Sequence, residues 1–256
     1  MQKTDKKNII IAGGAKSLGK YLALKLYNDN YNIIVLDNDE KSLELLKKES
    51  PDIKQIKVNL IDEQSVLSAF AIIEKEFGSI YALVYNAGYA NSNKITDFTY
   101  DEFMKCINVN LVGYFLLARE TAKNMIKNNI QGSIIEINSK SGCVGSMFNA
   151  GYSAAKFGGV GLTQSLALDL AKHNIRVNAL MLGNLLNSQM FESLIPAYAK
   201  KLNIAENKVK DYYIAKVPLK RGCEFEDVYN VLSFYISEKA SYCTGQSIKI
   251  TGGQVM

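Results

Sequence analysis

The sequence predicts one α/β domain with a doubly wound parallel sheet of the Rossmann type, covered by helices on both faces. Short apolar runs rich in β-branched residues alternate with longer segments of helical periodicity along most of the 256 residues. A glycine-rich turn follows the first of these runs. Hydrophobic residues make up 48% of the chain and no linker interrupts it, so residues 1–256 are expected to form a single domain.

The first two strands are expected at residues 8–12 and 32–36, whose near-continuous Ile, Val and Leu are typical of strands buried on both faces. Apolar residues at helical spacing predict a helix at 18–28 between them. Such crossover helices are what consecutive parallel strands require. The alternation continues with a helix at 40–49, a strand at 53–58, a helix at 63–77 and a strand at 80–84.

Longer helical patterns follow in the second half of the chain, at about 100–128 and at 151–172. The segment 185–218 breaks the alternation, because it mixes polar and apolar residues and is rich in Lys and Tyr. We expect it to form a helical substrate flap, and we use that name for it below. The remaining expected elements are strands at 133–137, 176–180 and 247–250 and a helix at 226–237.

The charge pattern argues against nucleic-acid and membrane partners. The net charge is +5, but the basic residues are dispersed, with no run longer than pairs such as Lys47-Lys48 and Lys200-Lys201. No segment approaches the ~18 apolar residues of a membrane span. The first apolar run is also too short for a signal peptide. A soluble, cytoplasmic protein is expected.

The cysteines and the histidine predict no metal site. Cys106, Cys143, Cys223 and Cys243 form no CxxC pair and show no metal-ligand spacing, and His173 is the only histidine. Free thiols in a reducing compartment are the expected state of these cysteines.

A dinucleotide-binding loop is predicted at residues 13–19, GGAKSLG, between the first strand and the first helix. Glycines there let the backbone turn tightly, so that free N–H groups of the helix can approach a pyrophosphate. A plain strand–helix turn can use glycines in the same way. The cofactor interpretation is favoured because the loop follows the first strand and an acid ends the second.

That acid, Asp37, predicts NAD as the cofactor. Its carboxylate can accept hydrogen bonds from both ribose hydroxyls of NAD, and it would repel the 2′-phosphate of NADP. Lys16 complicates the choice, because a basic residue in the loop can pair with that phosphate. An exposed, solvated lysine is the simpler interpretation of Lys16, and NAD remains the expected cofactor.

The candidate catalytic pair is Tyr152 and Lys156, which lie one helical turn apart on the same face. Oxidation of an alcohol needs a base near neutral pH, whereas free Tyr titrates at about 10. A cation ~6 Å away, at an effective dielectric near 20, contributes roughly 3 kcal/mol, or about two pKa units. A buried Tyr beside a solvent-seeking Lys is a common structural arrangement, but Ser139 and the upstream loop favour a catalytic pair.

The ordered set of motifs resembles the short-chain dehydrogenase/reductase family across nearly the whole chain. The spacing of Ser139 and the YxxxK motif is its most specific part. The resemblance rests on GGAKSLG at 13–19, Asp37, Asn86-Ala87-Gly88, Asn110, Ser139, Tyr152 and Lys156.

This resemblance implies a role for each motif. Tyr152 would be the general acid/base, and Lys156 would lower its pKa and hold the nicotinamide ribose. Ser139 would hydrogen-bond the reacting oxygen, and Asn110 would support a water-mediated proton relay. The implied cofactor contacts are Gly13, Ser17, Leu18, Gly19, Asp37, Asn59, Leu60, Asn86, Ala87, Gly88, Tyr152, Lys156 and Gly183, with Ser139 and Tyr152 also contacting the substrate.

Several positions depart from the family pattern. Ser17 stands where the middle glycine of the loop is usual, which predicts a slightly wider loop. Asn59 replaces an Asp that contacts the adenine, and Leu182 replaces the proline before Gly183. These departures affect contacts with the cofactor and leave the catalytic residues unchanged.

Further segments narrow the resemblance to enzymes that oxidise a sugar-alcohol phosphate with NAD. Two alternatives stay open: a family member acting on another polyol or a 3-oxoacyl thioester, and a non-catalytic NAD-binding sensor. The resemblance also implies a homotetramer, built partly on the helix that carries Gly158, Gly159 and Gly161. Packing of these glycines within the chain is the alternative.

A phosphate on the substrate needs at least one fixed cation, since its desolvation is otherwise uncompensated. The candidates near the catalytic residues or the flap are Lys140, Lys201, Lys216 and Lys220. Each of them alone is more simply a surface lysine. Lys140 carries the further objection that neighbours along an extended strand point to opposite faces, so that it would point away from Ser139.

Overall fold

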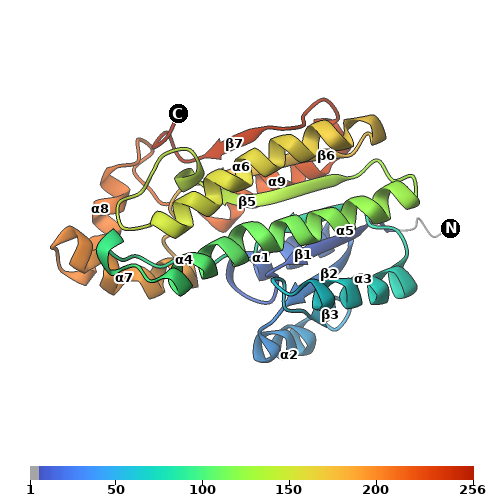
Figure 1. Cartoon of the computed structure of the whole chain (residues 1–256), viewed down its shortest axis with the longest axis horizontal. Coiled ribbons are helices and arrows are strands. Elements are labelled where there is room, and N and C mark those ends of the chain that lie inside the picture. Colours follow the sequence, from blue (N-terminus) through green and yellow to red (C-terminus); the bar gives the residue numbers. More distant parts are fainter. Residues whose placement is uncertain (1–5) are drawn as a thin grey trace.

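In the computed structural model, which describes residues 6–256, seven parallel strands form one sheet in the order β3-β2-β1-β4-β5-β6-β7 (Figure 1). The chain runs outward from β1 to β3 and then returns to β4 on the other side of β1, which creates a topological switch point. The predicted Rossmann-type fold is confirmed. The strands are β1 (Asn8–Ala12), β2 (Asn32–Asp37), β3 (Lys54–Lys57), β4 (Ala82–Tyr85), β5 (Ser133–Ser139), β6 (Arg176–Leu182) and β7 (Ser247–Ile250).

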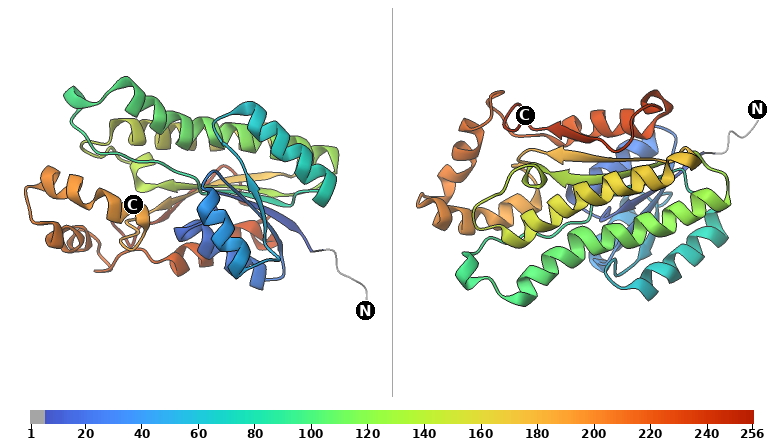
Figure 2. Two further views of the ribbon diagram at one scale, coloured as in Figure 1. Left: turned by 90° about the horizontal axis from the view of Figure 1, so that it is seen from below. Right: turned by 45° about the horizontal axis from the view of Figure 1, so that its top comes forward.

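Helices cover both faces of this sheet (Figure 2). One face packs against α3, α5 and α6, and the other against α1, α2 and α9. The helices are α1 (Ser17–Asn28), α2 (Glu40–Glu49), α3 (Glu63–Phe77), α4 (Tyr100–Ile107), α5 (Gly113–Lys127), α6 (Ala150–Leu170), α7 (Gln189–Leu202), α8 (Val209–Ala215) and α9 (Phe225–Ile236).

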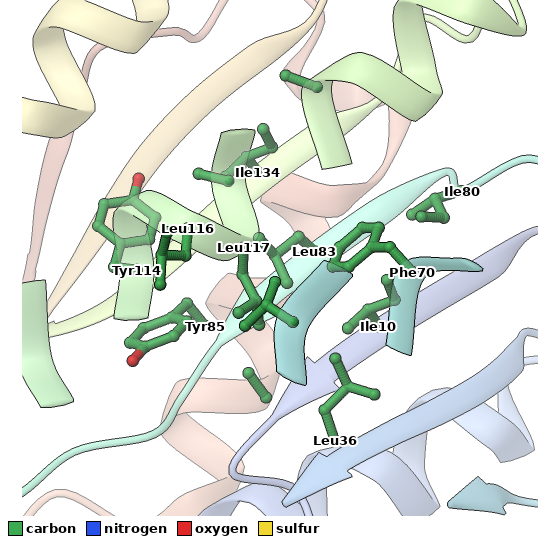
Figure 3. Packing of buried hydrophobic residues seen from close by; sticks show 14 of the residues in the cluster. Ile10, Leu36, Phe70, Ile80, Leu83, Tyr85, Tyr114, Leu116, Leu117 and Ile134 are labelled. Carbon is green, nitrogen blue, oxygen red and sulfur yellow. The ribbon is translucent and has the colours of Figure 1, made fainter. Parts of the chain in front are cut away.

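The core beneath α3 and α5 explains why the strands consist of nearly continuous apolar residues in the sequence. Ile10 and Leu83 from the central strands meet Phe70 of α3 and Leu117 of α5, and all four are buried (Figure 3). Because helices cover both faces, side chains on either side of each central strand are removed from water. Burial of this kind contributes roughly 1.5–3 kcal/mol for each large apolar side chain.

The helical pattern expected at about 100–128 forms two α-helices with an interruption between them, which periodicity did not predict. A π-helical turn, Asn108–Val112, separates α4 from α5. The Tyr85 hydroxyl donates a hydrogen bond to the Val109 carbonyl within this turn. A Cβ on Gly113 would lie 2.4 Å from the same hydroxyl. The interruption therefore depends on a contact with β4, which helical periodicity does not reveal.

The flap, residues 185–218, contains the helices α7 and α8, which lie together at one end of the molecule (Figure 1). Leu186, Phe191, Tyr198 and Val209 are buried in a small apolar cluster of their own. Phe191 and Tyr198 pack with ring centroids 5.6 Å apart. The flap helices are thus held together by contacts separate from those of the two main cores.

Of the described residues, no helix combines the length and hydropathy needed to span a bilayer. Cys106, Cys143, Cys223 and Cys243 are free thiols, and Cys106 is buried.

Candidate active site

The predicted site residues gather at the carboxyl ends of the strands. Parallel strands place these ends along one edge of the sheet, where ligands of doubly wound folds bind. Gly13, Asp37, Asn59, Asn86, Ser139 and Gly183 end or closely follow β1, β2, β3, β4, β5 and β6.

The glycine loop is packed closely against the segment after β4. Gly13 has a φ of +71°, and a Cβ there would lie 2.7 Å from the Cα atom of Ala87. The Asn86 side chain donates a hydrogen bond of 2.7 Å to the Gly13 carbonyl. A Cβ on Gly19 would lie 2.0 Å from that carbonyl oxygen, so both glycines are required by packing.

The first turn of α1 follows this loop and fits the binding of a pyrophosphate. Lys16 occupies the N-cap position without a side-chain cap hydrogen bond, which leaves backbone N–H groups at the helix start for an anion. Ser17 has a φ of +50°, in the left-handed region that favours glycine. This backbone geometry gives the physical reason for the usual glycine at the position of Ser17.

Asp37 is 7% exposed and is fixed by two backbone hydrogen bonds. Its Oδ2 accepts from the Ala15 N–H at 3.1 Å, and its Oδ1 accepts from the Asp39 N–H at 3.1 Å. The carboxylate therefore joins the end of β2 to the glycine loop.

Asp39 is a second acid at this end of the site, and sequence reasoning missed it. It forms an ion pair of 2.7 Å with Lys16, and the hydrogen bond from that lysine lowers the pKa of Asp39 to about 2. Lys16 is therefore an exposed cation, as expected, but one that is paired with Asp39. The pattern Asp37-x-Asp39 just after a buried strand was the available signal.

Tyr152 and Lys156 share one face of α6, as predicted. The Lys156 Nζ lies 5.9 Å from the centroid of the Tyr152 ring. Ser139 ends β5, and its hydroxyl accepts a hydrogen bond of 3.1 Å from the Ser141 N–H. Burial raises the pKa of Tyr152 to about 12, and a hydrogen bond with Ser139 acts in the opposite direction.

Lys156 is held by a buried carboxylate that the sequence analysis did not identify. Its Nζ donates a hydrogen bond of 2.8 Å to the Ile137 carbonyl and lies 3.6 Å from Oε1 of Glu136. The side chains are 3% and 0% exposed. Burial lowers the pKa of Lys156 and Glu136 raises it, while burial raises the pKa of Glu136 itself.

The fold makes room for Glu136. A Cβ on Gly159 would lie 2.4 Å from Glu136 Oε1, so the glycine is needed by this carboxylate. Glu136 Oε2 accepts a hydrogen bond of 2.8 Å from the Asn138 side chain. An acid within an apolar strand, with a glycine three residues after Lys156, was the signal in the sequence.

The lowering of the Tyr152 pKa by Lys156 stays a prediction, because other groups determine the pKa of this phenol in the structure. Burial dominates and leaves the pKa above the ordinary value, and Glu136 raises it further. The main reason is desolvation, because a buried phenolate loses its hydration, and the negative charge of Glu136 adds a smaller effect in the same direction.

Asn110 lies in the π-helical turn and is fully buried. Its Nδ2 donates to the Tyr89 carbonyl at 2.7 Å and to the Cys106 carbonyl at 2.8 Å. Its Oδ1 accepts from the Tyr89 N–H at 3.3 Å. The amide therefore ties α4 to the loop after β4, and its part in a proton relay stays a prediction.

The other predicted cofactor contacts lie along the same edge. Asn59 is exposed, and its N–H donates to the Ser65 hydroxyl at 3.0 Å. Gly183 donates its N–H to the Ile250 carbonyl at 2.8 Å. A Cβ on Gly88 would lie 3.2 Å from the Asn110 Oδ1. Leu18 and Leu60 are buried.

Three of the four candidate phosphate ligands line one cavity of about 230 Å³: Lys140, Lys201 and Lys216. Lys140 begins a 3-10 turn directly after Ser139, so the strand alternation that argued against it has ended there. Lys220 lies outside the cavity lining, and its Nζ donates to the Ala215 carbonyl at 3.3 Å.

The sequence pattern of the short chain dehydrogenase family matches residues 7–199. The chain is 52% identical to the sorbitol-6-phosphate 2-dehydrogenase of Escherichia coli K12 over 253 residues, covering 96% of this chain and 98% of that protein. It is 31% identical over 255 residues to a 3-oxoacyl-[acyl-carrier-protein] reductase of Staphylococcus aureus, covering 98% of both chains.

Among solved structures, the sorbitol-6-phosphate 2-dehydrogenase of Erwinia amylovora superposes with a TM-score of 0.92. The two chains are 51% identical, and the match covers 97% of this chain and 99% of the other. The ordered site residues, the strand order and these similarities agree: the chain belongs to the short-chain dehydrogenase family.

Proposed function

We propose that this protein is an NAD-dependent oxidoreductase that interconverts D-sorbitol 6-phosphate and D-fructose 6-phosphate. The observation that carries the proposal is the arrangement of Tyr152, Lys156 and Ser139 at the carboxyl edge of the sheet. The substrate is taken from the relatives, since the chain is 52% identical to a sorbitol-6-phosphate 2-dehydrogenase over nearly its full length.

In the oxidative direction, Tyr152 accepts the proton of the hydroxyl at carbon 2 of the hexitol. A bound NAD would supply the hydride acceptor for the same carbon, so that loss of the hydride and the proton would convert the alcohol into a ketone. Ser139 donates a hydrogen bond to the reacting oxygen and holds it against Tyr152. In the reverse direction Tyr152 returns the proton to that oxygen.

Lys156 is proposed to hold the nicotinamide ribose while its charge stabilises the tyrosinate. Burial makes this charge costly, and Glu136 together with the Ile137 carbonyl compensates for it. Asn110 is proposed to support the proton relay by fixing the backbone of the π-helical turn.

The rest of the NAD molecule is proposed to lie over the glycine loop, with its pyrophosphate at the start of α1. NAD is favoured over NADP because Asp37 is buried and fixed at the end of β2, where a ribose hydroxyl can donate to it. Asp39 adds to the repulsion of a 2′-phosphate and holds Lys16 in an ion pair. Further contacts are proposed from Gly13, Ser17, Leu18, Gly19, Asn59, Leu60, Asn86, Ala87, Gly88 and Gly183.

The alternative of a 3-oxoacyl reductase rests on the similarity of 31% to the S. aureus enzyme. The residues around the cavity beside Ser139 favour a phosphorylated polyol instead, because three of them are lysines.

We also propose a homotetramer that uses α5 and α6 together with the C-terminal segment. Phe115 of α5 and Phe157 and Leu168 of α6 are exposed apolar residues, and Leu168 is 81% exposed. Gly158 and Gly159 instead pack within the chain, against Leu111 and Glu136. Light scattering on the 28.4 kDa chain should give four times this mass, and a monomer would refute the proposal. The free thiols fit a reducing compartment, and we propose the cytoplasm.

One panel of activity assays tests the function. With NAD, the purified protein should oxidise sorbitol 6-phosphate far more efficiently than sorbitol, and it should not reduce an acetoacetyl thioester with NADH or NADPH. If the protein prefers plain sorbitol or the thioester, the proposed substrate is wrong and the preferred compound takes its place. Binding of NAD without turnover of any substrate would indicate a sensor instead of an enzyme.

A further inference from the structure

A basic cavity lies between the segment after β5 and the flap. We use this name for the cavity of about 230 Å³ that Lys140, Lys201 and Lys216 line. Lys140 comes from the 3-10 turn after β5, Lys201 from the last turn of α7, and Lys216 follows α8 directly. Residues far apart in the sequence therefore bring three cations to one space.

The three ammonium groups repel one another. Burial lowers the pKa of Lys140, and the charge of Lys216 lowers it further. Burial likewise lowers the pKa of Lys201, with added contributions from Lys140 and Lys216. Like charges brought together in a partly buried space destabilise the protein unless an anion compensates for them.

No anion of the protein compensates for them in residues 6–256, where none of the three lysines forms an ion pair with a carboxylate. Lys201 donates to the Met147 carbonyl, and Lys216 lies 4.2 Å from the centroid of the Tyr212 ring. Each ammonium group has three N–H donors, so most of these donors remain for a ligand.

The basic cavity adjoins the reacting residues. Ser141 lines it, and the N–H of Ser141 donates to the hydroxyl of Ser139. On the flap side, burial raises the pKa of Tyr198 to about 12, and Tyr152 adds to this increase. The Lys201 Nζ lies 5.6 Å from the Tyr198 ring centroid. Ser139 and Ser141 thus connect the basic cavity to the reacting residues.

We infer that Lys140, Lys201 and Lys216 together bind the terminal phosphate monoester of the substrate and so determine its specificity. This inference rests on the proposed function, which places carbon 2 of the hexitol at Tyr152. The rest of the carbon chain then extends outward, and the phosphate on carbon 6 reaches the cavity under the flap. A dianion there receives charge-assisted hydrogen bonds from three cations on two sides.

Single substitutions test each lysine. Lys140→Met, Lys201→Met and Lys216→Met keep most of the aliphatic stem and remove the charge, and Lys220→Met is the matched control outside the cavity. Each cavity variant should raise the KM for sorbitol 6-phosphate by about 10- to 100-fold. The KM for NAD and the weak turnover of plain sorbitol should stay unchanged, and Lys220→Met should behave as the wild type.

Inorganic phosphate provides a second measurement that does not depend on turnover. Calorimetry on the wild-type protein should detect phosphate binding, which the triple variant Lys140→Met/Lys201→Met/Lys216→Met should lose. The inference fails if the wild type oxidises sorbitol 6-phosphate and all three single variants keep its KM. If the wild type does not oxidise sorbitol 6-phosphate, the proposed function fails, and phosphate binding that is lost in the triple variant still supports an anion site. Equal phosphate binding by the two proteins would overturn that site as well.

Discussion

Lysine side chains occur in two opposite environments in this protein, one at Lys156 and the other in the basic cavity. Lys156 is buried and has fixed partners, the Ile137 carbonyl at 2.8 Å and Glu136 at 3.6 Å. Lys140 and Lys201 are only partly exposed, yet neither forms an ion pair in the described part of the chain. The charge of Lys156 is stabilised by partners in the protein, so its position is fixed before any ligand binds. The charges of the cavity lysines lack such partners, and a bound anion is needed to stabilise them.

This difference predicts which kinetic constant each lysine controls. Loss of a preorganised cation should reduce turnover, because its charge acts in the transition state. Loss of a cation that has no partner in the protein should instead weaken binding of the ligand that it contacts. This is the increase in KM expected for the lysines of the basic cavity.

The largest effect is expected at the catalytic pair. Tyr152→Phe should lower kcat by about 100-fold or more while the affinity for NAD stays nearly intact, because the ring still packs but cannot transfer a proton. Lys156→Met should damage both turnover and NAD affinity. Steady-state kinetics and NAD titration separate the two. Retention of more than roughly a tenth of the wild-type kcat in Tyr152→Phe would exclude this residue as the general base.

Lys16 provides a third setting, because it is an exposed cation that is paired with a carboxylate, Asp39. Substitution of the acids near Lys16 should change cofactor preference, with a somewhat smaller effect than at the catalytic pair. Asp37→Ser should weaken NAD binding and improve NADP relative to NAD by about tenfold, as repulsion of the 2′-phosphate is removed. Adding Asp39→Ser should increase this change, because it releases Lys16 from its ion pair. The ratio of kcat/KM for the two cofactors measures both steps. A wild-type preference for NADP would show that Lys16, and not Asp37, dominates.

The pair of Glu136 and Lys156 predicts a change in pH dependence. Burial lowers the pKa of Lys156 and Glu136 opposes this, so Glu136→Gln should let Lys156 lose its proton at lower pH. The alkaline decline of kcat should therefore shift downward by one pH unit or more, since opposite charges ~4 Å apart contribute about 4 kcal/mol at an effective dielectric near 20. Tyr85 and Tyr114 also face Glu136, but burial raises the pKa of each, so they stay neutral over this range.

Complete pH profiles of kcat for the wild type and Glu136→Gln are the measurement, with thermal unfolding as a check on folding. Superimposable profiles in two folded proteins would show that Glu136 does not act on Lys156.

The smallest effect is expected from a methyl group beside the same pair. Gly159→Ala should displace the Glu136 carboxylate, and the alkaline decline should move in the same direction as in Glu136→Gln, but less. Gly161→Ala is the matched control, because a Cβ there meets nothing within 4 Å. It should leave the pH profile unchanged and stabilise α6 by about 0.5–1 kcal/mol. Equal profiles for both variants would contradict the packing role assigned to Gly159.

Local patterns predicted those parts of the fold that local sequence determines. The expected bounds of α2 and α3 agree with the structure, since each helix begins after an Asp whose side chain caps it, Asp39 and Asp62. The π-helical turn at Asn108–Val112 was not predictable in this way, because it involves the Tyr85 hydroxyl from a distant strand.

The same division applies to the candidate site. Residues in ordered motifs, such as Tyr152 and Lys156, could be predicted to lie together because a helix fixes their spacing. Glu136 and Asp39 were missed because their importance comes from partners, Lys156 and Lys16, that only the folded chain brings near. The convergence of three lysines on one cavity likewise required the positions of α7 and α8.

The ion pair of Lys16 with Asp39 has a consequence for how cofactor preference can evolve. A lysine that could receive a 2′-phosphate is already present, but a neighbouring acid occupies it. Replacement of Asp39 alone would free Lys16 while Asp37 still repels the phosphate, and replacement of Asp37 alone would leave Lys16 occupied. The gain from either mutation thus depends on whether the other has already occurred, and a lineage that acquires both should shift its cofactor preference further than one that acquires either mutation alone.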